Sequence, residues 1–272
     1  MASEDKTFQP QVLYRNGDRV VTRINADTVT KEGKDFTIYE AMALLLLNDL
    51  DNEFPVPKVH SIQYEDGRKI DIEYKNGKTA NIVFLHDSLV IPSFDESGRQ
   101  NTKSFENHGI VKITMDFAEG ETLDKLWSSF DEEKKKVLAA DLKRCVSMFR
   151  EITGSTKIGA RFEGPVRIKG GSGILEGGPF NSVEEFNAFL EEHGETPERN
   201  ASQKIVFTHG DLVPQNILVN SENKVTTLVD WELAGHYPEY WEYRSAKCDP
   251  LPGWKEFLKS IFPDKDEQGN TS

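Results

Sequence analysis

The chain has 272 residues, of which 37% are hydrophobic and 29% charged, and its formal net charge is −13. This length and balance predict one large domain or two small lobes with a substantial core, and they exclude collagen-like, disulfide-rich and disordered proteins. The negative charge argues against a nucleic-acid partner, because binding to a phosphate backbone needs a basic surface.

Three sequence features bear on the cellular compartment. The longest apolar run, AMALLLL (41–47), is too short to span a bilayer. The first residues, MASEDKTFQP, include acids and lack the apolar stretch of a secretory signal. The two cysteines, Cys145 and Cys248, lie far apart and match no metal-ligand spacing. We therefore expect a cytoplasmic protein with reduced thiols and no membrane partner.

The first third of the chain has the pattern of a β-sheet. Short β-rich runs at 11–16, 19–24 and 28–33 are separated by NGD and NAD, which are hairpin-turn signals. FTIYEAMALLLLNDL (36–50) has apolar residues at helical spacing and predicts a helix. PVPKVHSIQYED then returns to strand.

Residues 66–109 enlarge this first part of the chain. KIDIEY and TANIVFL flank KNGK and predict an added hairpin. The polar stretch DESGRQNTKSFENHG that follows predicts a mobile loop. IVKITMDF (110–117) then resumes the sheet, and AEGETLDKLW leads the chain toward helical patterns.

Helical patterns dominate the rest of the sequence. DEEKKKVLAADLKRCVSMFREI has acids in its first turn, which suit the helix dipole, and it has one apolar face. The residues of that face are Leu138, Leu142, Cys145, Phe149 and Ile152. NSVEEFNAFLEEHGETP has a capping box of Ser182 and Glu185 and a stop signal at Gly194.

A glycine-rich segment, KGGSGILEGGPF (169–180), lies between these two predicted helices. It lacks the Gly-Lys-Ser/Thr ending of a phosphate-binding loop, and we interpret it as a flexible loop over the substrate side of a site. The change of pattern near Phe117 predicts two lobes. Residues 1–116 would form a β-rich lobe and residues 117–272 a mainly α-helical one.

Two polar motifs set in apolar runs carry the chemistry. THGDLVPQNILV (208–219) contains Asp211 and Asn216, and Asp230 ends an apolar strand in TLVDWELAG. The runs NILV and TTLVD predict a hairpin that brings Asn216 and Asp230 together over Asp211. Amide and carboxylate oxygens are the hard ligands that Mg²⁺ takes beside nucleotide phosphates. A carboxylate that binds no metal can accept the proton of an attacking hydroxyl or orient it, so the three residues predict phosphoryl transfer.

These motifs resemble the Brenner-type signature of the aminoglycoside phosphotransferase and choline kinase family, which has the protein-kinase-like fold. GHYPEYWEY is especially similar to fungal members of unassigned substrate, and GPFNSVEEFNAFL is similar to a segment those proteins carry ahead of the catalytic loop. The resemblance implies an α+β, bilobal fold. The β-rich N-terminal lobe would bind the nucleotide, and the C-terminal lobe would hold the catalytic and substrate sites.

The resemblance also implies roles for the catalytic and metal-binding residues. Asp211 would be the catalytic base or the group that orients the acceptor, while Asn216 and Asp230 would hold Mg²⁺. His209 could be taken for a general base, but in the resembled fold this histidine is architectural. Glu232 could touch a metal or the substrate, and a surface position is an equal alternative.

The implied nucleotide site lies in the first lobe and at the boundary. Lys31 matches the strand lysine that reaches the phosphates of ATP, although a lysine near a strand end is often just solvated. Glu40 matches the helix glutamate that holds this lysine, although exposure is the usual fate of such a residue. Ile113 to Ala118 would be the hinge against which adenine stacks, with Asp116, Phe117 and Ala118 binding the cofactor.

The sequence departs from the kinase pattern in informative places. The glycine-rich loop of kinases is absent from the first strands, where only RNGDR offers a turn. Gly210 stands where protein kinases have the arginine that reads activation-loop phosphorylation, and DWELAG runs into PEYWEY without an activation segment. We therefore expect a small-molecule acceptor rather than a peptide.

These features predict an ATP- and Mg-dependent phosphotransferase, a kinase that transfers the γ-phosphate to a hydroxyl of a small molecule. The missing glycine-rich loop keeps open a non-catalytic, pseudokinase-like module that only binds nucleotide. A two-metal phosphoesterase would need further clusters of His and Asp. The identity of the acceptor and the oligomeric state are left open by these patterns.

Overall fold

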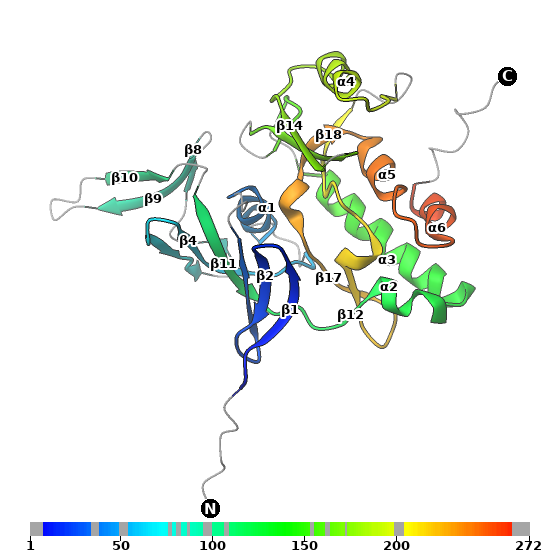
Figure 1. The fold of residues 1–272 in the computed structure, drawn as a ribbon, viewed down its shortest axis with the longest axis horizontal. Coiled ribbons are helices and arrows are strands. Elements are labelled where there is room, and N and C mark those ends of the chain that lie inside the picture. Colours follow the sequence, from blue (N-terminus) through cyan, green and yellow to red (C-terminus); the bar gives the residue numbers. More distant parts are fainter. Residues whose placement is uncertain are drawn as a thin grey trace, which may run out of the picture.

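The computed structural model describes residues 8–33, 38–48, 54–75, 78–79, 83–85, 88–94, 100–105, 109–152, 155–160, 164–171, 173–198 and 204–262. A β-rich N-terminal part lies beside a helical C-terminal part, as the sequence predicts (Figure 1). Among the helices in these ranges, none combines the length and the apolar character needed to cross a bilayer.

The N-terminal part is built on a six-stranded antiparallel sheet in the order β1-β2-β3-β11-β4-β5. Its strands are β1 (Gln11–Asn16), β2 (Arg19–Arg23), β3 (Thr28–Glu32), β11 (Ile110–Asp116), β4 (Val59–Tyr64) and β5 (Lys69–Asp71). The three predicted β-rich runs at the start of the chain become β1, β2 and β3. Because β11 lies between β3 and β4, the strand that leads out of the sheet is central and well anchored.

Helix α1 (Ile38–Asn48) joins the sheet to the helical part (Figure 1). Ala41 to Leu45 are all buried, because this helix packs against the sheet on one side and against the segment that follows β17 (Val225–Leu228) on the other. Its near-uniform apolar sequence is therefore explained by burial on more than one face.

The added region after β5 contains a hairpin and a small sheet. β6 (Tyr74–Lys75) pairs with β7 (Lys78–Thr79), which confirms a hairpin turn at KNGK. The longer arms that the sequence predicts do not pair with each other within the described residues, because β5 in KIDIEY pairs with β4 of the main sheet. β8 (Val83–Leu85), β9 (Ser88–Phe94) and β10 (Gln100–Phe105) form a separate sheet in the order β10-β9-β8.

The prediction of a mobile loop over DESGRQNTKSFENHG was wrong for Gln100–Phe105, which form β10. These residues pair in continuous register with β9, and such backbone pairing does not require apolar side chains on an edge strand. Residues 95–99 and 106–108 of the same stretch lie outside the described residues.

The helices of the C-terminal part are α2 (Leu123–Leu126), α3 (Glu132–Arg150), α4 (Val183–Glu192), α5 (Trp241–Ala246) and α6 (Trp254–Ile261). The five residues predicted for the apolar face of α3 are all buried. The predicted capping box is present at α4, where the Ser182 hydroxyl accepts a hydrogen bond from the Glu185 amide. The Glu185 carboxylate in turn accepts from the Asn181 amide.

Short strands in this part bring the polar motifs into position. β15 (Ile205–Thr208) pairs with β18 (Gly235–Pro238), β13 (Val166–Gly170) pairs with β14 (Gly173–Gly177), and β12 (Glu121–Thr122) extends the ladder of β16 (Ile217–Val219) and β17. The glycine-rich segment predicted as a flexible loop is therefore a hairpin over much of its length. The small size of Gly170 and Gly173, which pair at its turn, allows this tight connection; Ser172 lies outside the described residues.

The main hydrophobic core is continuous between the two parts of the molecule. It contains residues of α1, α3, α6, β4, β11, β16 and β17. Trp231 is fully buried at its centre, with its ring stacked on Phe207 and edge-on to Phe149. The polar motifs are thus attached to the most tightly packed region of the protein.

Candidate active site

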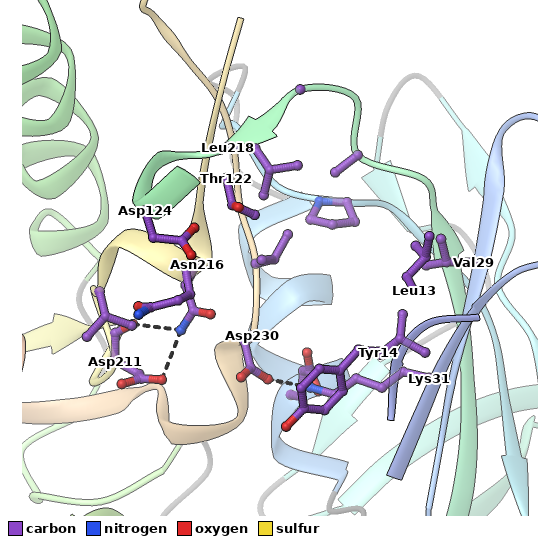
Figure 2. A pocket seen from close by; sticks show the side chains of 18 of the residues that line it. Leu13, Tyr14, Val29, Lys31, Thr122, Asp124, Asp211, Asn216, Leu218 and Asp230 are labelled. Atoms are coloured by element: carbon purple, nitrogen blue, oxygen red, sulfur yellow. Dashed lines mark hydrogen bonds and ion pairs between the residues drawn. The ribbon is translucent and has the colours of Figure 1, made fainter. Parts of the chain in front are cut away.

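One pocket of about 890 Å³ lies between the sheet and the helical part, and it is lined by the residues that the sequence analysis assigns to catalysis, metal binding and cofactor binding. Figure 2 shows Lys31, Asp211, Asn216 and Asp230 among them. The residues of the full set are Lys31, Glu40, Asp116, Phe117, Ala118, Asp211, Asn216 and Asp230. They come from β3, α1, β11 and the hinge after it, and the segments around the β16–β17 hairpin. Residues that are far apart in the sequence therefore share one cavity.

The predicted β16–β17 hairpin is present and carries Asn216 and Asp230 at its two open ends. The backbone amide of Val229 donates to the carbonyl of Asn216 over 3.0 Å, which ties the two ends together. The Asn216 Nδ2 amide donates to both the backbone oxygen and Oδ2 of Asp211, each at 2.9 Å (Figure 2). Because its NH₂ group is directed at Asp211, the Oδ1 of Asn216 is the atom left to bind a cation.

Asp230 adopts a left-handed backbone conformation, with φ 67° and ψ 59°. Non-glycine residues in this region are strained, and such strain is typical of positions fixed by function. The side chain of Asp230 is 35% exposed toward the pocket, and its Oδ1 accepts a hydrogen bond from Lys31 Nζ. The turn after β17 thus holds a carboxylate at the surface of the cavity.

Lys31 connects the sheet, α1 and the segment that carries Asp230. Its Nζ donates to Glu40 Oε2 at 2.7 Å as well as to Asp230. The side chains of Lys31 and Glu40 are only 12% and 2% exposed. The solvated alternatives for these two residues are therefore wrong, and the pair that the resemblance implied is present.

Burial and ion pairing compete at this bridge. Burial disfavours the charge of Lys31, but the carboxylates of Glu40 and Asp230 outweigh it, so the pKa of Lys31 lies above its ordinary value. Burial raises the pKa of Glu40 to about 7 despite Lys31. Burial would also raise the pKa of Asp230, but the charge of Lys31 dominates and lowers it. Lys31 is therefore a fixed positive charge inside the pocket.

His209 has the architectural role that the sequence interpretation favours. It is fully buried against Trp231. Its Nδ1 accepts from the Asp211 amide at 3.2 Å, and Nε2 lies 3.1 Å from the Val229 carbonyl. Since Nδ1 accepts, Nε2 carries the proton and the ring is neutral, in agreement with a pKa lowered by burial. The ring links the Asp211 segment to the residue before Asp230.

A buried glutamate that sequence reasoning missed supports the same segment from below. Glu242, on α5, is 1% exposed, and its two carboxylate oxygens accept from the amides of His209 at 2.7 Å and Gly210 at 3.2 Å. Burial raises the pKa of Glu242 to about 7. Gly210 itself has φ 82°, and a Cβ there would lie 2.4 Å from the carbonyl oxygen of Leu233. Only glycine fits this position without displacing the backbone.

Glu232 joins the two parts of the molecule instead of facing solvent. Its Oε1 binds Arg19 of β2 at 2.8 Å, and Arg167 of β13 donates to its backbone oxygen at 2.9 Å. Arg19 also lines the pocket.

A register shift in β1 places both Leu13 and Tyr14 at the pocket as well. The β1–β2 hairpin therefore contributes Leu13, Tyr14 and Arg19 to the lining of the pocket.

The hinge is shorter than predicted. Met115 to Ala118 line the pocket, whereas Ile113 is fully buried in the core. The carboxylate of Asp116 is bound by His60 Nε2 at 2.7 Å and by the Lys58 amide at 3.1 Å. The side chain of Asp116 is therefore bound by β4 and by the residue just before it.

The amide N–H of Ala118, in the hinge, has no hydrogen-bond partner within the described residues.

Lys169, on β13, lines the pocket and is another residue that sequence reasoning missed. Its Nζ lies 2.6 Å from Asp211 Oδ1. The lysine opens the KGGSG segment, but its approach to Asp211 depends on the β13–β14 hairpin, which the sequence interpretation treated as a loop. Charge near a glycine-rich turn was the only signal in the sequence.

Comparison with known proteins gives a family match over the part of the chain that carries the two polar motifs. A model of the phosphotransferase enzyme family APH matches residues 172–245, which include Asp211, Asn216 and Asp230. Comparison with curated protein sequences gave no match.

Solved structures give the same fold over nearly the whole chain. APH(2'')-IIa in its ternary complex with streptomycin and ATP has a TM-score of 0.57 and 12% identity, over 97% of this chain and 79% of that chain. ADP-bound aminoglycoside phosphotransferase APH(2'')-Ib has a TM-score of 0.56 and 11% identity over the same shares. An apo thermostable mutant of APH(4)-Ia has a TM-score of 0.55 and 12% identity, over 94% of this chain and 80% of that chain. The α+β kinase-like fold and the family resemblance are confirmed; the likeness to fungal members stays a prediction.

Proposed function

We propose that this protein is an ATP- and Mg-dependent phosphotransferase that transfers the γ-phosphate to a hydroxyl of a small molecule. The observation that carries the proposal is the convergence of Asp211, Asn216, Asp230 and Lys31 on one pocket. A fixed cation, two oxygen ligands and a separate carboxylate are the parts that phosphoryl transfer needs. The matched family and the nucleotide-bound neighbours support this chemistry.

In this proposal residues 1–116 form the nucleotide-binding lobe. Lys31 binds the phosphates of ATP, and Glu40 holds its ammonium group in place. The N–H of Ala118 donates to the edge of adenine, since it has no partner in the described part of the chain. Phe117 contributes to the adenine pocket through its backbone, because Arg23 already covers its ring at 3.6 Å.

Residues 117–272 form the catalytic and substrate lobe. Asp211 orients the acceptor hydroxyl and accepts its proton, and Asn216 holds the Asp211 carboxylate by the contact at 2.9 Å. His209 and Glu242 keep this segment fixed from behind. The acceptor is a small molecule, because the chain lacks an activation segment on which a peptide could bind.

The donor set fits Mg²⁺ that arrives with the nucleotide. Asn216 offers Oδ1 and Asp230 offers a carboxylate, both hard oxygen ligands. No group of three or more His, Cys, Asp or Glu side chains that could hold a metal ion occurs within the described ranges. Two protein ligands suit an ion that keeps waters and shares phosphate oxygens, and Mg²⁺ would there neutralise charge on the phosphates.

The test is product formation with a panel of hydroxyl compounds. Wild type and Asp211→Asn are incubated with Mg·ATP and each compound, and mass spectrometry detects gain of one phosphoryl group. Streptomycin and hygromycin B are logical first members, because they appear in structures with the same fold. Product with wild type but not with Asp211→Asn supports the proposal. Tight Mg·ATP binding with neither product nor ATP hydrolysis would instead support a nucleotide-binding module.

A further inference from the structure

A lysine outside the predicted motifs touches the proposed catalytic carboxylate. Lys169 Nζ lies 2.6 Å from Asp211 Oδ1, while the other oxygen, Oδ2, is bound by Asn216. The side chain of Lys169 is 61% exposed and that of Asp211 is 8% exposed. The ammonium group therefore occupies the open, pocket-facing side of Asp211. This is the side from which an acceptor hydroxyl must approach.

The strand that carries Lys169 is firmly held. Two residues earlier on β13, Arg167 is 5% exposed, and its backbone N–H and C=O both bind the hydroxyl of Tyr237 at 3.1 Å. The Arg167 guanidinium also donates to Glu232 and Glu176. Because side chains two apart on a strand point to the same face, Arg167 and Lys169 are directed toward the catalytic segment together. A firmly held strand therefore places the long side chain of Lys169 next to Asp211.

The charges around the pocket show why such a cation is useful there. Glu40 and Asp230 share Lys31, and Glu232 binds Arg19 and Arg167. Lys31, Arg19 and Arg167 are therefore paired with carboxylates other than Asp211. Among the pocket cations within the described residues, Lys169 is the one bound to Asp211. Negative charge that develops on a transferred phosphoryl group next to Asp211 would therefore meet Lys169 as the pocket cation already in contact with that carboxylate.

We propose that Lys169 is a further catalytic residue: its ammonium group binds the oxygens of the transferred phosphoryl group when the acceptor hydroxyl takes its place at Asp211 Oδ1. This inference rests on the proposed function. The acceptor oxygen forms a bond to the γ-phosphorus, and the bond to the β–γ bridging oxygen breaks with its electron pair remaining on ADP. The hydroxyl proton passes to Asp211, and Lys169 keeps its own protons throughout and stabilises the charge on the phosphoryl oxygens.

Three variants separate this role from a structural one. Lys169→Met removes the charge at similar length, Lys169→Arg keeps it, and Lys143→Met removes an exposed charge from α3, away from the pocket. ATP hydrolysis with water as acceptor gives kcat and KM. We expect Lys169→Met to lower kcat about tenfold or more with little change in the KM for ATP, and Lys169→Arg to restore part of the loss. An equal kcat in Lys169→Met and wild type would overturn the inference.

A binding experiment gives a readout that does not depend on turnover. Mg·ADP is titrated into each variant with and without aluminium fluoride, which imitates the phosphoryl group in transfer. We expect fluoride to tighten Mg·ADP binding to wild type and Lys143→Met about tenfold or more, and this gain to be lost in Lys169→Met but partly kept in Lys169→Arg.

The other outcomes are distinguishable. If wild type fails to bind Mg·ADP, the proposed function falls and the inference with it. If Mg·ADP binds but fluoride gives no gain in wild type, or the same gain in Lys169→Met, the inference alone is overturned. A Lys169→Met variant that does not fold, or that binds Mg·ADP poorly, would assign the lysine a structural role and overturn it as well.

Discussion

The two sides of the pocket are held together by different forces. On the C-terminal side, Asp211 and Asn216 belong to a hydrogen-bonded segment that His209 and Glu242 attach to the buried core. On the N-terminal side, Lys31 of the sheet forms ion pairs with Glu40 of α1 and with Asp230. The first arrangement fixes atoms through backbone contacts, whereas the second depends on the balance between burial and ion pairing.

This difference indicates which side of the pocket is held rigidly and which side depends on pH and on bound charge. Asp211, Asn216, His209 and Glu242 on the C-terminal side all make hydrogen bonds within the protein, so a nucleotide is not needed to organise this segment. Lys31 instead has two carboxylate partners, one of which, Asp230, is also a proposed metal ligand. Substitutions on the C-terminal side should therefore affect turnover, and substitutions on the N-terminal side should affect charge, pH dependence and nucleotide affinity.

The largest expected effect belongs to the C-terminal side. Asp211→Asn should lower the rate of phosphoryl transfer or ATP hydrolysis roughly 1,000-fold, because the amide cannot accept a proton, while Mg·ATP binds as in wild type. Steady-state kinetics and calorimetry measure the two quantities. Asp66→Asn, at an exposed position outside the pocket, is the control. Turnover that survives in Asp211→Asn would show that another group performs this step.

The second prediction breaks the ionic bridge of the N-terminal side. Lys31→Met leaves Glu40 and Asp230 without their shared cation, so the free energy of unfolding should fall by roughly 3 kcal/mol at pH 8. The loss should shrink at pH 5.5, because the pKa of Glu40 is already raised to about 7 and the group takes up a proton. Urea unfolding at both pH values measures this. A loss that does not depend on pH would contradict the ionic account.

The third prediction concerns Glu242, which binds the backbone amides of His209 and Gly210 next to Asp211. The pKa of Glu242 is raised to about 7 in the folded protein from an ordinary value of 4.5. An acid with a raised folded pKa contributes its full stability below the unfolded pKa and loses it as the pH rises through the folded one. Wild type should thus lose roughly 2–4 kcal/mol from this group between pH 4.5 and 8.

Glu242→Gln removes that titration and serves as its own comparison. Its free energy of unfolding should be lower than that of wild type at pH 5, since an amide cannot accept from both the His209 and Gly210 amides, and it should change less between pH 5 and 8. The contribution of Glu40 cancels in the difference between the two proteins. Parallel pH dependences in both would show that the Glu242 carboxyl does not titrate in this range.

The contrast also explains how much the sequence could predict. Asp211, Asn216 and Asp230 lie close together in the chain, on a hairpin whose alternating apolar runs are visible in the sequence, and the family match covers them. Lys31 was found only through the resemblance. Strands β1, β2, β3 and β11 and the capped helix α4 follow local patterns, and each lies within a predicted stretch, whereas the place of β5 in the main sheet was not predicted.

The residues that were missed depend on tertiary contacts. Lys169 and Glu242 meet the catalytic segment through strand pairing and a buried helix, and no local spacing encodes either approach. The strand β10 is polar and lies at a sheet edge, so its composition resembled a loop. Glu232 had an ambiguous position until the fold placed it between Arg19 and Arg167.

The smallest expected effect tests whether the β1–β2 hairpin, which lines the pocket, contacts the nucleotide. Arg19→Ala should lower the free energy of unfolding by less than about 1 kcal/mol, because its partner Glu232 keeps Arg167. It should weaken Mg·ATP binding about threefold to tenfold if the β1–β2 hairpin covers the phosphates. Arg15→Ala, at an exposed position of the same hairpin outside the pocket, is the control. Equal affinities in the two variants would exclude Arg19 from the nucleotide site.

The most direct test of the proposed site is calorimetric titration of ATP into wild type and Asp230→Ala, with and without Mg²⁺. The pocket geometry predicts one ATP per chain, binding that requires Mg²⁺, and a loss of affinity of about 100-fold or more in Asp230→Ala. Asp66→Ala should bind as wild type does. Wild-type protein that binds no Mg·ATP, or Asp230→Ala that binds it unchanged, would contradict a nucleotide site built on Asn216 and Asp230.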